Sequence, residues 1–313
     1  MIATVTGPGV FSSSRSATKG GFMKRRLGSS RSWSSVSVVL LLALGACVSV
    51  DTAKDDNGGD EAKTVEDTVR RSQQAENAGD ADEFLALWTD KGLEAYDVGS
   101  REEIQKDEAE LGSEKIEILG FSDTKVNGDK ATTVARATPE EFQVAKVLYQ
   151  GTFSLVKEDG EWLIDGFDFE GSPPPDEGSP VVGINAVEYG FTLDTADFGR
   201  DAAFRFTNSG TQQHELVLYK GPDTVDIGTA KTALENVDGS ELNNIPPGYQ
   251  VDHVGFAEPG EAVDVTFAEP LPAGTYVIAC YIPDGGFNEQ FEPVNPDGNP
   301  HIQLGMINKF TVT

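Results

Sequence analysis

The spacing of apolar and polar residues differs between the first and second half of the chain. In the first half, residues 64–77 have a helix-favouring composition, and residues 81–88 place Phe84, Leu85, Leu87 and Trp88 at helical spacing. Strand patterns follow at residues 116–121, 125–137, 142–157 and 161–169, with turns at residues 127–129 and 158–160. Helices followed by an antiparallel meander predict an α+β domain over residues 64–171, which we expect to fold by itself.

The second half carries mainly strand patterns. Short runs rich in Val, Phe and Tyr lie at residues 181–193, 202–208, 215–219, 262–267, 275–281 and 309–313, separated by Gly and Pro. One short helix is expected at residues 229–237. These features are typical of an all-β sandwich, predicted here over residues 181–313. Residues 172–180 contain a run of three prolines and no side chain suited to burial, which predicts a stiff linker.

The N-terminal segment has the pattern of an export signal. Residues 1–46 hold six basic and no acidic side chains, and the apolar run 38–46 is too short to span a bilayer. Translation is expected to start at Met23, directly before three basic residues. The run ends in Leu-Gly-Ala-Cys, residues 44–47, which resembles the bacterial lipobox and implies that Cys47 is acylated after cleavage. The alternatives are an ordinary signal peptide with a free Cys47, or an uncleaved anchor.

The charge of the chain limits its partners. It contains 52 acidic and 24 basic side chains, so its net charge is −28, and loss of residues 1–46 would leave 18 minus 52, or −34. Such a surface repels nucleic acids and anionic lipid headgroups. Membrane attachment is therefore expected to rest on the lipid, with residues 47–63 as an acidic tether. Two cysteines 233 positions apart exclude a disulfide framework.

The helices-then-strands order and the ending of the first domain, residues 153–167, resemble the NTF2-like (SnoaL-like) superfamily. The resemblance implies a curved sheet wrapped around a helix, forming a cone with a pocket. Family enzymes commonly place a His or Asp base there, but residues 64–171 contain no histidine. Asp165 or Asp168 could face the pocket, although each is expected on the solvated face, so no catalysis is predicted. Four aromatic residues are expected in the core and not in a ligand cage: Trp88, Tyr96, Tyr149 and Trp162.

The candidate chemistry lies in the rare residues of the second domain. Cys280 ends a strand pattern, His214 opens another, and His301 precedes Met306 by five positions. One thiol, two imidazoles and one thioether are the donor set of a blue-copper site. Taken singly, each has a simpler explanation: Cys280 as a small core residue, Met306 as core filler and His301 as a solvated loop residue.

Residues 181–313 resemble the cupredoxins of the plastocyanin and azurin type. The resemblance rests on Asn-Ser-Gly before His214, Gly-Thr-Tyr before Cys280, the His301-x4-Met306 ending and the closing strand. It implies a Greek-key sandwich in which His214, Cys280 and His301 hold one type 1 copper and Met306 is the axial ligand. Twenty residues separate Cys280 from His301, where the family has a few. His253 matches no family position and is expected at the surface.

An internal repeat accounts for this long separation. Pro-Asp-Gly at residues 283–285 recurs at residues 296–298, so we expect an insertion that leaves and returns with its ends close. The acidic and aromatic residues 287–291 within it would either cover the copper or extend a docking face.

Two main functions are consistent with these patterns. The first is a lipid-anchored electron carrier on the extracytoplasmic face of the cell membrane, with one copper and an unidentified redox partner. The second is a copper-handling or small-ligand-binding lipoprotein without redox turnover, in which the NTF2-like cone holds a ligand. An enzyme that uses the cone is a third class, disfavoured by the missing histidine.

Overall fold

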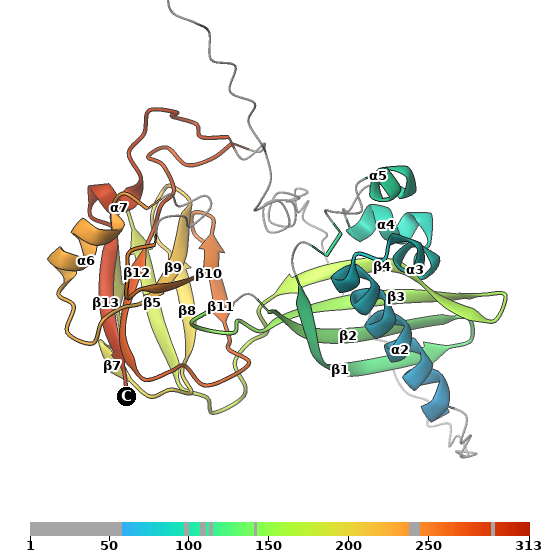
Figure 1. Ribbon diagram of the computed structural model, residues 1–313. Coiled ribbons are helices and arrows are strands. Elements are labelled where there is room, and N and C mark those ends of the chain that lie inside the picture. The colour runs from blue at the N-terminus through green and yellow to red at the C-terminus, as the bar shows by residue number, and fades with distance from the viewer. Residues whose placement is uncertain are drawn as a thin grey trace, which may run out of the picture.

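The computed structural model describes residues 58–96, 100–106, 111–112, 115–140, 143–237, 245–288 and 292–313. The expected signal peptide, Met23 and the lipidation site Cys47 lie outside this range. No helix within it is long and apolar enough to cross a membrane. Figure 1 shows two units: helices packed on one sheet, and a strand-rich unit with two further sheets.

The first unit consists of helices followed by an antiparallel sheet. The helices are α2 (Gly58–Ala78), α3 (Ala81–Ala86), α4 (Asp90–Tyr96) and α5 (Arg101–Lys106). The strands β1 (Ile116–Asn127), β2 (Lys130–Pro139), β3 (Tyr149–Glu158) and β4 (Glu161–Gly171) pair in the order β1-β2-β3-β4. Helix α2 begins at Gly58, within the expected tether, because Asp60 and Glu61 in its first turn interact favourably with the helix dipole.

Aromatic rings fill the space between α2 and the sheet. Trp88 lies 4.7 Å from Tyr96 and 5.6 Å from Phe84, measured between ring centroids. The indole Nε1 donates to Ser72 Oγ at 2.7 Å, and the Tyr96 hydroxyl donates to Glu76 at 2.9 Å. As expected from the sequence, Trp88, Tyr96 and Trp162 are buried in the core of this unit. Tyr149 differs, because it is half-buried and packs against the core of the second unit.

The strand boundaries differ from expectation at two places. The expected break at residues 122–124 is an irregularity within β1, where Asp123 adopts a φ of 53°. The third strand begins at Tyr149 and not at residue 142, because residues 143–148 cross to the second unit. There Leu148 N donates to Thr266 O at 2.8 Å, and Ala268 N donates to Lys146 O at 2.7 Å.

The second unit contains two sheets that share one core. The five-stranded sheet has the order β10-β9-β12-β13-β7 and the four-stranded sheet β11-β8-β5-β6. Most pairs are antiparallel, but β5 pairs with β8, and β7 with β13, in parallel. The strands are β5 (Val181–Val187), β6 (Gly190–Leu193), β7 (Asp197–Phe198), β8 (Ala203–Asn208), β9 (His214–Lys220), β10 (Gln250–Ala257), β11 (Ala262–Val265), β12 (Gly274–Ala279) and β13 (Ile307–Val312).

Strand β9 is buried on both faces, which explains its continuous apolar run. Leu216 and Leu218 lie in the core between the sheets, while Val217 and Tyr219 belong to a smaller core on the other side. Helix α6 (Ile227–Leu234) contributes Ala230 and Leu234 to this smaller core. A strand buried on both faces needs no polar alternation.

Candidate metal centre

Two strands and one short helix bring His214, Cys280 and His301 together. His214 is the first residue of β9, Cys280 follows the last residue of β12, and His301 opens helix α7 (His301–Leu304). Strands β9 and β12 pair antiparallel, so the beginning of one lies beside the end of the other. Ile302 N donates to Cys280 O at 2.7 Å, which ties α7 to the end of β12.

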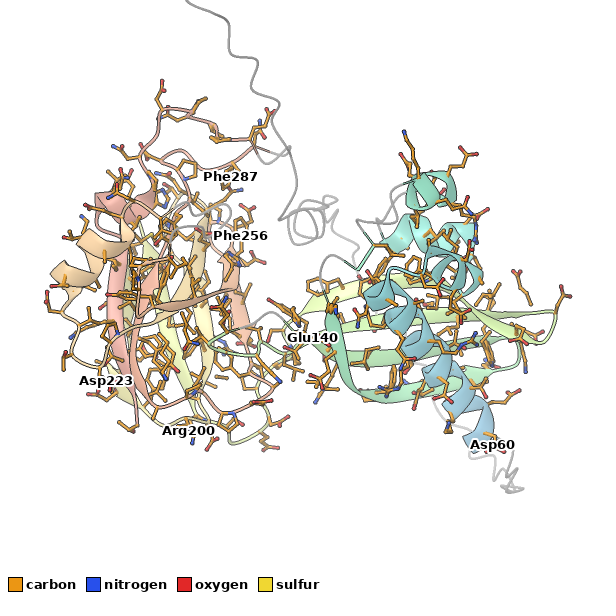
Figure 2. All side chains as sticks on the ribbon, in the orientation of Figure 1. Asp60, Glu140, Arg200, Asp223, Phe256 and Phe287 are labelled. Atoms are coloured by element: carbon orange, nitrogen blue, oxygen red, sulfur yellow. The ribbon has the colours of Figure 1, made fainter. Side chains whose placement is uncertain are left out.

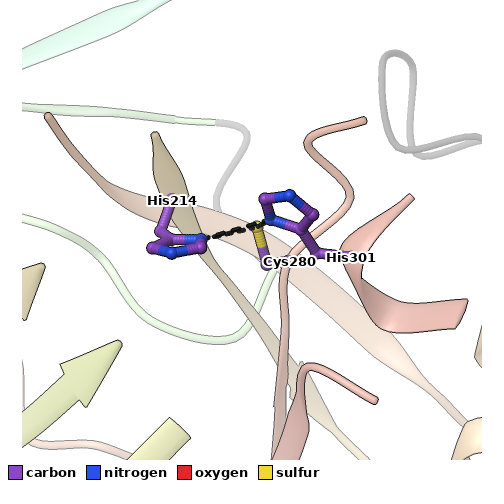
Figure 3. Close-up of side chains that lie close together, drawn as sticks. All are labelled: His214, Cys280 and His301. Atoms are coloured by element: carbon purple, nitrogen blue, oxygen red, sulfur yellow. Dashed lines mark hydrogen bonds between the residues drawn. The ribbon is translucent and has the colours of Figure 1, made fainter. Parts of the chain in front are cut away.

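The donor atoms of these side chains converge on one point, as Figure 3 shows. The His214 Nδ1 to His301 Nδ1 distance is 3.2 Å. The Cys280 Sγ lies 3.5 Å from His301 Nδ1 and 3.9 Å from His214 Nδ1. Within the part of the chain that the structure describes, this is the one group of at least three His, Cys, Asp or Glu side chains close enough to share a metal ion.

The environment keeps both imidazoles neutral. All three side chains have no exposed surface. Burial and, to a smaller extent, the neighbouring His301 lower the pKa of His214 from 6.5 to about 4, against the opposing effect of Glu188. Burial likewise lowers the pKa of His301 and raises that of the Cys280 thiol. Neutral imidazoles present the lone pairs that a metal requires, while the thiol must lose its proton on binding.

Met306 is fully buried and joined to the same residues through its backbone. Its N–H donates to His301 O at 2.9 Å, and its carbonyl accepts from Cys280 N at 3.3 Å. The backbone therefore places Met306 beside the site. Its role as an axial ligand stays a prediction.

The loop before His214 is shaped by an asparagine and a glycine that sequence reasoning did not assign to the site. Buried Asn208 donates to Gln212 O and Ala257 O and accepts from Gly210 N. A Cβ on Gly210 would lie 2.9 Å from the Nε2 of His214, so a side chain there would displace the ring. That Nε2 is buried and has no hydrogen-bond partner among the residues that the structure describes.

His253 is not the simple surface residue expected from the sequence. It lies half-buried on β10, a strand that the sequence pattern did not predict, and its Nε2 is 3.1 Å from the Glu215 carboxylate. Glu215 also accepts from Tyr281 N at 2.7 Å, and its own N–H donates to Cys280 Sγ at 3.5 Å. His253 is therefore a neighbour of the site through Glu215, and it does not belong to the metal-binding group.

The insertion between Cys280 and His301 leaves and returns with its ends close, as expected. Pro283 pairs with Pro300 in an isolated bridge, and Asp284 N donates to Asn299 O at 3.0 Å. Phe287 packs against the core shared by the two sheets. Residues 289–291, which hold the rest of the expected covering segment, lie outside the described residues.

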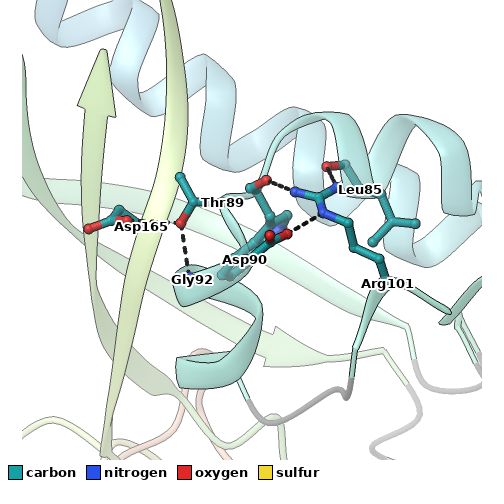
Figure 4. A network of polar contacts seen from close by, with 7 residues as sticks. Leu85, Thr89, Asp90, Gly92, Arg101 and Asp165 are labelled. Atoms are coloured by element: carbon teal, nitrogen blue, oxygen red, sulfur yellow. Dashed lines mark hydrogen bonds and ion pairs between the residues drawn. The ribbon is translucent and has the colours of Figure 1, made fainter. Parts of the chain in front are cut away.

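The two candidate acids of the first unit lie away from its aromatic core. Asp165 accepts from Thr89 Oγ1 at 2.8 Å, as Figure 4 shows. It also forms an ion pair with Lys91. Burial acts to raise the Asp165 pKa, but these two hydrogen bonds outweigh it and lower the pKa. Asp168 is exposed on β4. Neither carboxylate is placed as an internal base.

Comparisons with known proteins give two groups of similar structures. No family model and no curated protein matches the chain. Among solved structures, auracyanin B is 24% identical over 45% of this chain and 92% of that chain (TM-score 0.28). Dithionite-reduced auracyanin from Roseiflexus castenholzii is 22% identical over 43% and 98% (TM-score 0.26). An NTF2-like protein of unknown function from Shewanella oneidensis is 13% identical over 35% and 98% (TM-score 0.29).

All three structures are less than 25% identical to the chain and have TM-scores below 0.5, so no property of theirs is assigned to this chain. The two groups are NTF2-like proteins and cupredoxins, the same two families that the sequence resembles.

Proposed function

We propose that the second unit is a Greek-key cupredoxin that holds one type 1 copper on His214, Cys280 and His301, with Met306 as axial ligand, and that the chain carries single electrons. The observation that supports this most strongly is the convergence of three buried donor atoms within 3.9 Å. A thiolate with two imidazoles favours copper or zinc over harder metals. When bound, copper would supply a one-electron couple.

The residues of this chain fit such a role because they are held in place before any metal binds. Backbone hydrogen bonds fix Cys280 to Ile302 and Met306, and His214 begins a strand buried on both faces. A preformed site limits the rearrangement that accompanies a change of charge. Burial of all three donors also excludes water, which favours retention of the metal over its transfer to another protein.

A redox cycle distinguishes the carrier from the copper-handling alternative. The purified protein with one equivalent of Cu(II) should develop an intense thiolate-to-copper colour that is bleached by a mild reductant and restored by an oxidant. Colourless, tight Cu(I) binding without this reversible band would favour copper handling instead.

We also propose that the protein is anchored on the extracytoplasmic face of the cell membrane through acylated Cys47. The support is the sequence at residues 44–47 and the acidic charge of the remainder. The test is mass spectrometry of the N-terminus together with detergent partitioning of a Cys47→Ser variant. Unmodified Cys47, or a variant that stays with the membrane, would overturn the proposal.

For the first unit we propose a supporting or ligand-binding role without catalysis. Asp165 is engaged with Lys91 and Thr89, and the region around Trp88 is packed with aromatic rings. A hydrolase or isomerase activity that disappears in Asp165→Asn or Asp168→Asn would contradict this.

A further inference from the structure

The outer side of the His301 ring is covered by a cluster of polar side chains that are not candidate metal ligands. The Nε2 of His301 lies 3.2 Å from Oε1 of Gln212. The same Oε1 accepts from Gly285 N at 2.6 Å, so one amide oxygen joins the histidine to the inserted loop. His301 is consequently fully buried, although its ring edge faces away from Cys280.

The orientation of the Gln212 amide is fixed from its other end. Its Nε2 donates to Asp284 Oδ1 at 3.1 Å and lies 3.4 Å from the Tyr189 hydroxyl. Tyr189 in turn donates to the same Asp284 oxygen at 2.6 Å. Since a carboxylate only accepts, the NH₂ group of Gln212 must face Asp284, which leaves the oxygen for His301.

Tyr189 holds an unfavourable backbone conformation in this cluster. Its φ is 62°, in the left-handed region that aromatic residues rarely adopt. Its ring packs edge-on against His301, with centroids 5.4 Å apart. Tyr189 lies in the tight turn between β5 and β6, where Val187 pairs with Gly190, and this turn directs its side chain toward Asp284, Gln212 and His301.

We propose that Gln212 is a positioning residue for His301: it accepts a hydrogen bond from Nε2–H and thereby keeps the Nδ1 lone pair directed toward Cys280 and the metal. Asp284 and Tyr189 hold Gln212 in this orientation. This inference rests on the proposed metal site. A hydrogen-bond acceptor behind a ligating imidazole fixes its tautomer and increases its basicity.

The neighbouring Gln213 provides a matched control. Its Oε1 accepts from Phe287 N at 2.7 Å and its Nε2 donates to Glu258 at 3.0 Å, so it also holds the inserted loop. No hydrogen bond of Gln213 reaches His301 among the described residues. Comparison of Gln212→Leu with Gln213→Leu therefore separates positioning of the histidine from attachment of the loop.

The first readout uses the metal-free protein. In ¹H–¹⁵N spectra of the imidazoles, the wild type and Gln213→Leu should show one His301 tautomer, protonated at Nε2 and protected from exchange. Gln212→Leu should show a mixture of tautomers or rapid exchange of this proton. The same tautomer and the same protection in all three proteins would overturn the inference, even if no copper binds.

The second readout is metal affinity, measured by competition with a chelator. Gln212→Leu should bind about 10- to 100-fold more weakly than the wild type, whereas Gln213→Leu should be unchanged. Gln212→Glu keeps the acceptor oxygen and should restore the affinity, with a lower reduction potential because the added charge favours Cu(II). Equal losses of metal affinity in Gln212→Leu and Gln213→Leu would show that Gln212 only holds the inserted loop, and would refute its positioning role. Absence of the thiolate–copper band in the wild type would instead refute the proposed function.

Discussion

Gly210 shows how a single residue can shape the site without touching the metal. An added Cβ would come within 2.9 Å of His214 Nε2 and of a Glu188 carboxylate oxygen. We predict that Gly210→Ala lowers the free energy of unfolding by about 1–3 kcal/mol through overpacking and weakens metal binding. Chemical denaturation and metal competition measure the two effects. Gly199→Ala is the control, because a Cβ there meets nothing within 4 Å. Unchanged metal binding in Gly210→Ala would show that the His214 ring is not constrained.

The pKa values of the histidines predict the pH dependence of the metal-free protein. Because burial lowers the pKa of His214 from 6.5 to about 4, the unfolded chain binds a proton at pH 5 that the folded chain does not. The contribution of His214 to the free energy of unfolding is thus fully present above pH 6.5 and decreases as the pH falls toward 4. The loss between pH 7 and pH 5 from His214 alone should be about 2 kcal/mol.

Denaturation at several pH values tests this expectation. Replacement of His214 by Gln should reduce the loss of stability between pH 7 and pH 5 and leave the part that comes from His301, whose pKa burial also lowers. An identical pH profile in the variant would mean that His214 accepts a proton in the folded protein as readily as in the unfolded chain.

Sequence reasoning located the candidate ligands because their residue types are rare in this chain. Cys280, His301 and Met306 stand out by composition, and the resemblance to cupredoxins implied that His214, Cys280 and His301 share one site. Gln212 could not be recognised in this way. Glutamine is an ordinary loop residue, and its role depends on the folded position of Asp284.

At the scale of the elements, the inserted loop between Cys280 and His301 behaves as an addition to an intact site. Its ends meet at the Pro283–Pro300 bridge, and the returning chain passes so close that a Cβ on Gly298 would lie 2.5 Å from Asp284 O. We predict that deletion of residues 286–298, which joins Gly285 to Asn299, preserves copper binding and the visible band. Titration of the deletion variant with Cu(II) measures this. A folded variant without the band would show that the insertion is part of the site.

Strand β10 and helix α7 are among the elements that escaped prediction, each for an identifiable reason. Strand β10 contains Asp252, His253 and Gly255, which interrupt an apolar alternation, and it forms because its backbone pairs with β9. Helix α7 has only four residues and ends at Gly305, whose φ of 118° suits glycine. Such short or polar elements depend on tertiary contacts that a local pattern does not contain.

At the scale of the whole molecule, a buried carboxylate joins the two units. Asp252 on β10 accepts from three successive backbone N–H groups of the first unit, at residues 143–145, over 2.6 to 2.8 Å. Val144, Ala145 and Val147 also belong to the core of the second unit. In Figure 2 Glu140, just before this segment, lies between the two units. The Pro-rich linker is also attached to the second unit, because Thr266 Oγ1 donates to Pro173 O at 2.7 Å.

These contacts predict coupled unfolding of the two units. Asp252→Ala leaves three backbone N–H groups, two of them buried, without their carboxylate acceptor. It should lower the free energy of unfolding by about 3 kcal/mol or more, with thermal unfolding separated into two transitions. Glu269→Ala, which removes an exposed ion pair to Lys146 at the same junction, should cost less than about 1 kcal/mol. Calorimetry distinguishes these outcomes. An unchanged single transition in Asp252→Ala would show that this carboxylate does not couple the units, and two transitions already in the wild type would show that they unfold independently, as the sequence alone suggested.

The most direct test of the account is a Cu(II) titration of the wild-type protein beside Cys280→Ser, with absorption and melting temperature recorded together. The wild type should gain an intense visible band that saturates at one equivalent, and copper should raise its melting temperature because the metal binds the folded state. Cys280→Ser should lose the band entirely, since the absorbing charge transfer requires the sulfur. No band in the wild type, or a band that survives in Cys280→Ser, would contradict copper binding by His214, Cys280 and His301.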